Sequence, residues 1–494
     1  MTMQTPPISP PARPVPGASP VVDAASVRRR LADSPGDADA WTSLGVLLSQ
    51  GGDRDAAVRR HRRALTIAPT QGDAWGNLGT ALTGPGRHGQ AIACIQRAMA
   101  LDPGSPAACS ALTTALYRAG DFDAESTALE WVIRLQPANR ALLWGRAQIR
   151  LHDGDYAQGF ADYECRYWLD EYRYRFHRGP RWDGGPLDGR FVMVTLEQGF
   201  GDTLLMARYL PMLKARGARR VMVELRDELR RLFAAMEGPV EGVDAFIRQD
   251  AAPTPIYHVH SSIMSLPLRF GTTIDGVPPP VRLTVPEEAR AKAARLLGPG
   301  DDPPKEPLPG PLPGPLKVGI VWSGSGAFPD NAIRATTLDR FLRFLDVPGV
   351  AVYSLQKGPP EEELRTLPPG TPIVALGPEL EDFADTAAVV ERLDLVIMTD
   401  SSVAHLAGSL GTPVWNLLQH VPYWIYGRSG TTTPWYPAMR LYRQGPDEDW
   451  EPVFDAALRD LHALAERRRS GGPAPLPTTP CRTGPCRTGN APDI

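Results

Sequence analysis

Apolar positions in the first third of the chain recur every 34 residues, starting near residue 23, and the pattern then changes. Within each period they fall at helical spacing in two runs separated by a glycine, which predicts two amphipathic helices joined by a tight turn. The residues in register are Trp41 and Trp75; Leu44, Leu78 and Leu112; Pro69, Pro103 and Pro137; and the turn glycines Gly52, Gly86, Gly120 and Gly154.

The sequence Trp-x2-Leu-Gly at the start of the period and the proline at its end resemble the tetratricopeptide repeat (TPR), in which each helix pair buries its face against the next. The resemblance implies a TPR solenoid of three to four units over residues 23–165. Its surface would bind a peptide or protein partner. The alternative, a generic helical bundle, does not require glycines and prolines to stay in phase.

After the repeats, an aromatic connector at residues 166–190 predicts a cap that joins the solenoid to the next domain. Short apolar strands then alternate with helices, a pattern typical of a parallel α/β sheet. The predicted lobes are residues 191–297, with strands at 191–196 and 221–224, and residues 317–467, with strands at 317–322, 351–355, 395–398 and 414–417. We therefore expect an α-helical solenoid followed by two Rossmann-like lobes with a cleft between them.

Three proline-rich segments lack hydrophobic periodicity. Residues 1–22 and 468–494 cannot bury enough apolar surface to offset chain entropy, and we predict that they are disordered. Residues 298–316 predict an extended linker between the two lobes, which would let the lobes close over a substrate.

Charge and cysteine content narrow the function. Lys plus Arg (53) nearly balance Asp plus Glu (56), and the net charge of −3 offers no broad cationic field for nucleic acid. The five cysteines lack the spacing of a zinc site or a disulfide framework, which favours a reducing compartment. No segment has the apolar length of a signal peptide core or a transmembrane helix, so we expect a cytoplasmic protein, with peripheral docking at the inner membrane left open.

The first candidate for chemistry follows the strand at 191–196. Gly199 and Gly201 allow a tight turn, and Asp202 at a helix start could accept the proton of an acceptor hydroxyl. One alternative is a dinucleotide fingerprint with Glu224 as the ribose ligand, but Leu204 occupies its third small position. The other is a plain N-terminal capping carboxylate.

The second candidate, Asp400-Ser401-Ser402-Val403-Ala404-His405, follows the strand at 395–398. The helix that it opens leaves N–H groups free to hold a diphosphate, and His405 lies about one turn along, near enough to contact a phosphate or to orient Asp400. A half-buried helical histidine is the alternative.

Several segments resemble the heptosyltransferase-like (family 9) glycosyltransferases that occur fused to TPRs in bacteria. They are EQGFGDTLLMARYLPMLKARGA, YHVHSSIMSLPLRFGTTID, VGIVWSGS, SLQKGP and DSSVAHLAGSLGTPVW, which together extend over about residues 190–465. The resemblance implies a GT-B fold. It also implies an enzyme that inverts the anomeric centre of the sugar without a metal ion or other cofactor. It also implies that the first lobe holds the acceptor and the second the nucleotide sugar.

The resemblance implies that Asp202 occupies the position of the proposed base in that family. Gly199 and Gly201 would then belong to the loop on the acceptor side. The implied nucleotide-sugar residues are Ser323, Gly324, Arg334, Gln356, Lys357, Asp400, Ser401, Ser402 and His405. Lys357, with Arg334 second, would balance the charge of the leaving diphosphate. Ser402 departs from the family glycine, which could narrow the approach of a phosphate and puts donor choice and activity in question.

Two further features bear on the site. Aromatic residues within 415–436 could stack on a base or sugar, although core packing explains any one of them equally well. The acidic run at 447–449 is better interpreted as a solvated turn than as a metal site.

The leading hypothesis is transfer of a hexosyl, heptosyl or related sugar from a nucleotide sugar to a hydroxyl of a protein or glycolipid, with the TPRs recruiting the acceptor or a partner. The alternatives are a non-catalytic TPR scaffold with a degenerate nucleotide-binding domain, and a nicotinamide-dependent enzyme.

Overall fold

The computed structural model divides the chain into two compact units, Met1–Ala128 and Leu129–Ile494. The predicted termini, most of the 298–316 linker and residues 170–178 of the connector lie outside the residues that it describes. Those described are residues 23–84, 86–137, 139–169, 179–197, 199–237, 242–249, 255–298, 314–326 and 331–470.

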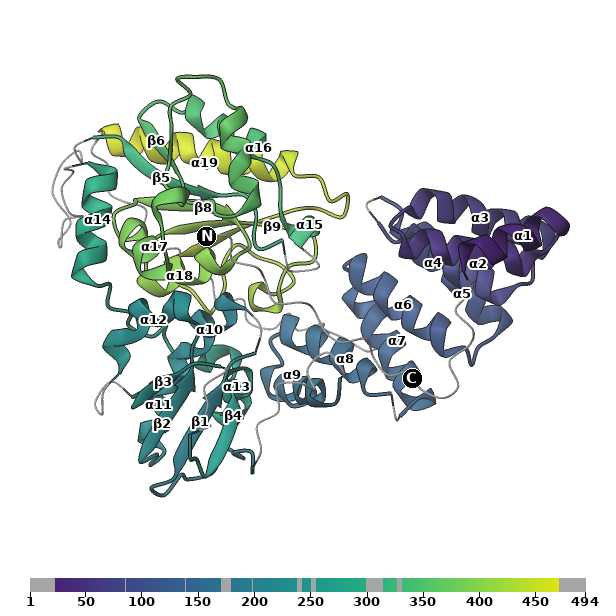
Figure 1. The fold of residues 1–494 in the computed structure, drawn as a ribbon, viewed down its shortest axis with the longest axis horizontal. Helices are drawn as coiled ribbons and strands as arrows, with labels where there is room; N and C mark the ends of the chain where they lie inside the picture. The colour runs from purple at the N-terminus through teal and green to yellow at the C-terminus, as the bar shows by residue number, and fades with distance from the viewer. Residues whose placement is uncertain are drawn as a thin grey trace, which may run out of the picture. The chain divides into compact units, whose positions relative to one another are not determined.

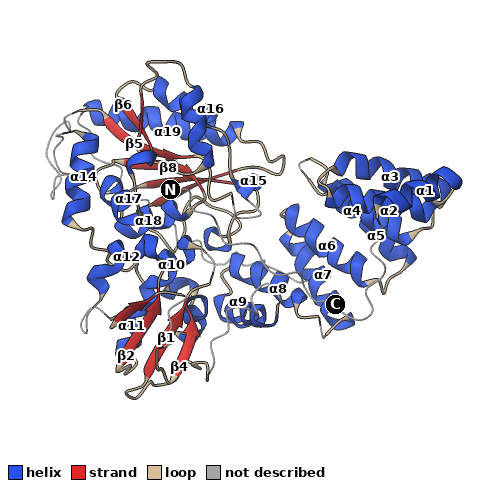
Figure 2. Cartoon of the chain, viewed as in Figure 1, coloured by secondary structure: helices blue, strands red, loops and turns tan. Residues whose placement is uncertain are grey.

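Paired helices form the first unit, as the 34-residue period predicts, and Figure 2 shows them without strands. Small residues recur where the helices of a pair approach closely: a Cβ added at Gly45 would overlap the ring of His61, and one at Gly79 would overlap Ile95. The helices are α1 (Ala24–Asp33), α2 (Ala38–Gln50), α3 (Arg54–Ile67), α4 (Gly72–Leu82), α5 (His88–Leu101), α6 (Pro106–Arg118) and α7 (Phe122–Leu135), of which the last continues into the second unit.

The turn glycines have a conformational reason for their register. All four have positive φ angles, from 68° to 86°, a region that only glycine enters without strain. They lie between α2 and α3, α4 and α5, α6 and α7, and finally α8 (Ala141–His152) and α9 (Tyr156–Tyr163). The period therefore continues into the second unit.

A four-stranded parallel sheet forms the first α/β lobe, with strand order β3-β2-β1-β4. The central strands β1 and β2 are mostly apolar, and all but the first residue of each is buried, as expected for a sheet covered on both faces. The elements are β1 (Phe191–Thr195), α10 (Phe200–Met206), α11 (Leu210–Ala215), β2 (Arg220–Glu224), α12 (Asp227–Phe233), β3 (Ala245–Ile247), β4 (Val259–Ser262) and α13 (Leu266–Arg269).

A six-stranded parallel sheet, β10-β9-β8-β5-β6-β7, forms the second lobe. The last helix, α19 (Glu451–Ser470), packs against β9 and β10. The other elements are β5 (Leu316–Val321), α15 (Asn331–Arg334), α16 (Leu338–Leu342), β6 (Val350–Ser354), β7 (Ile373–Ala375), α17 (Phe383–Val390), β8 (Leu395–Thr399), α18 (Ser402–Leu410), β9 (Val414–Leu418) and β10 (Met439–Arg443).

Helix α14 (Glu287–Leu297) precedes the predicted linker and belongs by sequence to the first lobe, yet it packs against α17 of the second lobe (Figure 1). Its small buried residues Ala289 and Ala293 permit the close approach. The lobes meet a second time where α10 lies against α18. Two parallel α/β lobes after helical repeats confirm the predicted fold class.

The last repeat, α8 and α9, belongs to the same compact unit as the lobes and touches both of them. Helix α9 packs against α13 of the first lobe, and the buried Tyr156 hydroxyl accepts a hydrogen bond from Trp435 Nε1 of the second lobe at 2.7 Å. Across the described part of the chain, no helix combines the length and the apolar character needed to cross a membrane.

Candidate functional site

Each sheet has a topological switch point, where successive strands lie on opposite sides of the first strand, and the candidate loops leave the sheets there. In the first sheet β1 lies between β2 and β4, and in the second β5 lies between β6 and β8. Ligands of open parallel sheets bind outside the carboxyl ends of the strands at such switch points. Asp202 follows β1, Ser323 follows β5 and Asp400 follows β8, so the topology places these three predicted residues at the switch points.

Asp202 lies in the first turn of α10, where its carboxylate contacts both lobes. Its Oδ2 accepts the N–H of Gly199 at 3.2 Å, which holds the side chain over the turn. Its Oδ1 lies 3.5 Å from the hydroxyl of Tyr423, a residue of the second lobe. The predicted loop residue Gly201 also faces the second lobe, because a Cβ there would lie 2.7 Å from Cδ2 of His405.

The surroundings of Asp202 favour its protonated form. Burial raises the pKa of Asp202 to about 6, against the hydrogen bond from Gly199, and the negative charges of Glu197 and Asp400 add to the increase. A carboxylate with a pKa near 6 is ionised at neutral pH and retains enough basicity to accept a proton from a hydroxyl in a transition state.

Asp400 and the two serines lie where β8 leads into α18. The hydroxyl of Tyr426 donates to Asp400 Oδ1 at 2.7 Å, and Arg334 Nη1 lies 3.9 Å from Asp400 Oδ2. Ser401 is the N-cap residue of α18, and its Oγ lies 3.4 Å from the N–H of Val403. Ser402 is the first helical residue, a position that needs no glycine because its φ is not positive.

His405 is buried and neutral. Burial, together with the positive charges of the nearby Arg208 and Arg334, lowers its pKa to about 3. Its Nδ1 lies 3.2 Å from the hydroxyl of Tyr436 rather than on Asp400, and its ring packs against Gly201. In this position His405 joins the lobes, and the expected contact with a phosphate stays a prediction.

The loop after β5 is built around an asparagine that the sequence did not single out. Asn331 Nδ2 donates to Ser323 Oγ at 3.1 Å, and its Oδ1 accepts the N–H of Gly324 at 3.0 Å. A Cβ at Gly324 would lie 2.7 Å from Arg334 Nη2, so the glycine lets the guanidinium approach the backbone. Asn331 lies in a four-residue helix without periodicity, which left no sequence signal.

Gln356 supports this loop from behind. It is buried, its Oε1 accepts the N–H groups of Trp322 and Ser323, both at 3.0 Å, and its Nε2 donates to the Ser323 carbonyl. The side-chain amide of Gln356 is thus hydrogen-bonded to backbone groups, and its contact with a nucleotide stays a prediction.

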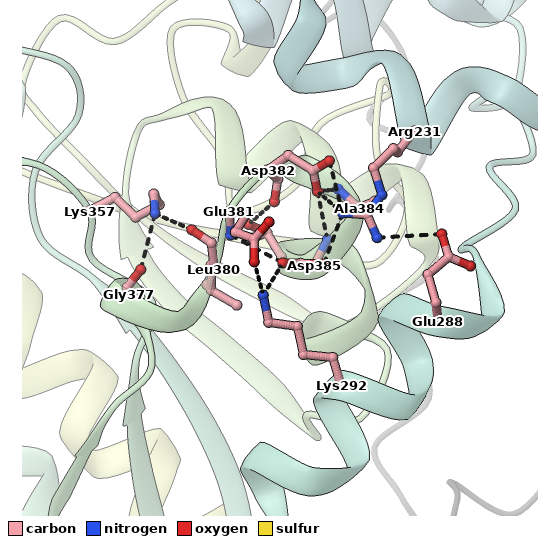
Figure 3. Close-up of polar contacts among 11 residues, drawn as sticks. Arg231, Glu288, Lys292, Lys357, Gly377, Leu380, Glu381, Asp382, Ala384 and Asp385 are labelled. Atoms are coloured by element: carbon pink, nitrogen blue, oxygen red, sulfur yellow. Dashed lines mark hydrogen bonds and ion pairs between the residues drawn. The ribbon is translucent and has the colours of Figure 1, made fainter. Parts of the chain in front are cut away.

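Lys357 has its ammonium directed at the turn before α17 (Figure 3). Nζ donates to the carbonyl of Gly377 at 3.0 Å and to that of Leu380. Its predicted role beside a leaving diphosphate would require it to leave these carbonyls. Arg334, the second candidate, lies closer to Asp400 and to the start of α18.

Arg208 is a site residue that the sequence did not predict. It is buried, Nη2 donates to the Trp435 carbonyl at 3.1 Å, and its guanidinium lies over the rings of Trp435 and Tyr436. The arginine comes from the first lobe and the two aromatic residues from the second. Like the contact between Gly201 and His405, this stacking joins the two lobes.

One alternative interpretation, the dinucleotide fingerprint, loses support from the geometry. Glu224 is buried, and its Oε2 accepts the N–H of Leu196 at 3.0 Å, so the expected ribose ligand is engaged inside the sheet. At 447–449, Asp449 accepts the N–H of Glu451 at 3.0 Å, near the start of α19. Within the described ranges, no group of three or more His, Cys, Asp or Glu side chains is placed to hold a metal ion.

Family models of the tetratricopeptide repeat match residues 40–74, 72–105 and 111–165. The N-terminal helices are therefore TPRs, as the period and its Trp-x2-Leu-Gly signature predict.

Three relatives extend the comparison. Protein FlbA of Caulobacter vibrioides (strain ATCC 19089 / CIP 103742 / CB 15) is 28% identical over 355 residues, which cover 66% of this chain and 56% of FlbA. The solved structure of a family 9 glycosyl transferase from Veillonella parvula DSM 2008 is 15% identical, with a TM-score of 0.39, and covers 57% of this chain and 99% of that one. A thermophilic TPR protein of Thermus thermophilus is 16% identical, with a TM-score of 0.27, over 30% of this chain and 80% of its own.

Proposed function

We propose that the α/β lobes transfer a sugar from a nucleotide-activated donor to a hydroxyl group of a protein or glycolipid, with inversion and without a metal ion. The observation that carries the proposal is Asp202. This partly buried carboxylate, with a pKa of about 6, lies at the switch point of one parallel sheet and contacts the other lobe through Tyr423.

In the proposed step Asp202 accepts the proton of the acceptor hydroxyl while the oxygen forms a bond to the anomeric carbon. The bond from that carbon to the diphosphate oxygen breaks, and the diphosphate leaves with the electron pair. Attack opposite the leaving group inverts the centre. The N–H groups in the first turn of α18, with that of Val403 released from Ser401 Oγ, and the guanidinium of Arg334 would stabilise the diphosphate.

The repeats would recruit the acceptor or a protein partner. This part of the proposal is supported by the TPR matches and by the packing of the last repeat on both lobes. An acceptor held by the repeats would be delivered at high effective concentration to the same molecule.

A ligand screen on the full chain tests the proposal. UDP, GDP, ADP, CMP, their sugars and NAD are compared by thermal unfolding, where a ligand at one hundred times its Kd should stabilise by about 2.7 kcal/mol. We expect one nucleoside diphosphate series to bind. Turnover is then measured with that sugar donor, for the wild type and for Asp202→Asn.

Asp202→Asn should keep the stabilisation by nucleotide and lose about 10²–10⁴-fold in turnover. Asp339→Asn is the matched control, an exposed aspartate in the first turn of the short helix α16, and should keep full turnover. Full turnover by Asp202→Asn would contradict the assignment of the base. Binding of NAD alone would instead favour the nicotinamide enzyme, and binding of no ligand the TPR scaffold.

A further inference from the structure

Arg166, in the 3-10 turn Glu164–Trp168 that ends the repeats, is a buried arginine with every N–H group engaged. Nε and Nη2 donate to Glu197 at 2.9 and 2.6 Å, and Nη2 also donates to Ser265 at 2.8 Å. Nη1 donates to the Glu164 carboxylate at 2.8 Å and to the Tyr163 carbonyl at 3.0 Å. One side chain from the turn that directly follows the last repeat is therefore hydrogen-bonded into the first lobe.

The partner of Arg166 lies next to the candidate base. Glu197 is the second residue after the end of β1, five residues before Asp202, and is itself buried. Its Oε1 also accepts the hydroxyl of Ser262, at the end of β4. Glu197 therefore ties the start of the loop between β1 and α10 to the neighbouring strand and, through Arg166, to the last repeat.

A buried ion pair of this kind contributes little net stability, because removing both charges from water costs about as much as their attraction returns. Well-packed apolar residues would hold the repeat on the lobe equally well. An arginine fork on a carboxylate, in contrast, fixes direction as well as distance. The pair is thus better suited to orienting the loop than to strengthening the fold.

We infer that Arg166 is a positioning residue for Asp202, so that the turn that joins the last repeat to the first lobe forms part of the site rather than a mere connection. Arg166 acts through Glu197, which it holds and whose charge it balances. The inference rests on the proposed function in so far as Asp202 is the base.

Three variants of the full chain test the inference. Arg166→Lys keeps the charge and loses the fork; Glu197→Gln removes the negative charge near Asp202; and the double variant Arg166→Met/Glu197→Gln removes both charges, so that neither is left buried alone. Arg146→Met is the matched control, because Arg146 lies in α8 and pairs at 2.7 Å with Asp162 of α9, within the last repeat.

The first measurement needs no substrate. Hydrogen exchange is followed in peptides that cover residues 199–206. We expect faster exchange of α10 in Arg166→Lys and in the double variant, and unchanged exchange in Arg146→Met.

The second measurement is the pH profile of kcat with the sugar donor found by the ligand screen. Among the described residues, the titratable groups that face Asp202 are Glu197 after β1, Asp400 after β8, and Tyr423 and Tyr436 between β9 and β10. Glu197→Gln should move the acid limb of the profile to lower pH, because it removes a negative charge near the base. Arg166→Lys should leave the limb in place and lower kcat about tenfold or more at unchanged donor KM, as expected for a displaced base. A purely structural role for Arg166 would lower the amount of folded protein in Arg166→Lys and leave kcat per folded molecule unchanged.

The outcomes separate this inference from the proposed function. Turnover by the wild type, with kcat and exchange in Arg166→Lys the same as in Arg146→Met, would overturn the role of Arg166 and leave the transferase standing. No turnover with any donor, but faster exchange of α10 in the Arg166 variants alone, would overturn the transferase and support the coupling of the repeat to the loop.

Discussion

Replacement of Gly201 by alanine should force the two lobes apart where α10 packs against α18. Gly201 lies in α10, and a Cβ added there would lie 2.7 Å from Cδ2 and 3.2 Å from Nε2 of His405. The imidazole cannot easily retreat. It is buried, with its Nδ1 on the hydroxyl of Tyr436, and the Tyr436 ring in turn packs against Gly408.

Two opposing effects determine the magnitude. Alanine in place of glycine favours a helix by about 0.5–1 kcal/mol. Overpacking of a tight contact costs about 1–3 kcal/mol. Because the shortest distance is far below van der Waals contact, the second effect should dominate, and we expect Gly201→Ala to lower the free energy of unfolding by about 1–2 kcal/mol.

Urea unfolding followed by tryptophan fluorescence measures this difference. Gly76→Ala is the matched control, a helical glycine in α4 whose added Cβ would lie 3.8 Å from Ala98, and it should not destabilise the chain. The double variant Gly201→Ala/His405→Ala gives the new methyl group room in place of the imidazole. The free energy of unfolding of this double variant should be higher, by about 1 kcal/mol or more, than the value expected from adding the changes in the two single variants.

Either of two results would refute this reasoning. Wild-type stability of Gly201→Ala would show that the contact is loose. Additivity of the two substitutions within about 0.5 kcal/mol would show that the methyl group and the imidazole do not compete for the same space.

Three further predictions concern stability. Burial raises the pKa of Asp202 from 3.8 to about 6, so the folded protein loses stability as this carboxyl group ionises between about pH 4 and 6. Asp202→Asn should therefore add up to about 3 kcal/mol to the free energy of unfolding at pH 7.5 and nothing at pH 4. Equal effects at the two pH values would contradict the pKa shift. Arg231→Met removes ion pairs between the lobes (Figure 3) and should lower the free energy of unfolding in urea by about 1–3 kcal/mol. The control Arg365→Met, in an exposed pair, should lower it by about 0.5 kcal/mol or less. Similar losses in both would show that burial of the acidic partners of Arg231 does not matter. Tyr156→Phe leaves the buried Nε1 of Trp435 without its acceptor and should cost about 1–3 kcal/mol by the same assay, and no loss would show that the indole finds another partner.

Much of the fold could be predicted from local sequence patterns. The 34-residue period identifies the paired helices, and the glycines at their turns have the positive φ angles that explain their register. The strands at 191–196 and 395–398 are recognisable because a strand buried on both faces is a short continuous apolar run. The positions of Asp202 and Asp400 directly after such strands then place them at the carboxyl edges of the sheets.

The partners of those residues depended on packing between segments far apart in the chain. Asp202 lies next to Tyr423, 221 positions away, and His405 faces Gly201 and Tyr436 instead of Asp400. The amide of Gln356 and the ammonium of Lys357 bind backbone carbonyls of their own lobe. A sequence pattern records which positions are buried and how the backbone turns locally, and this determined the elements and their edges. Which polar group meets which depends on strand order and on the close approach of helices, so only the tertiary structure decided the contacts of the site and the insertion of Arg166 into the first lobe.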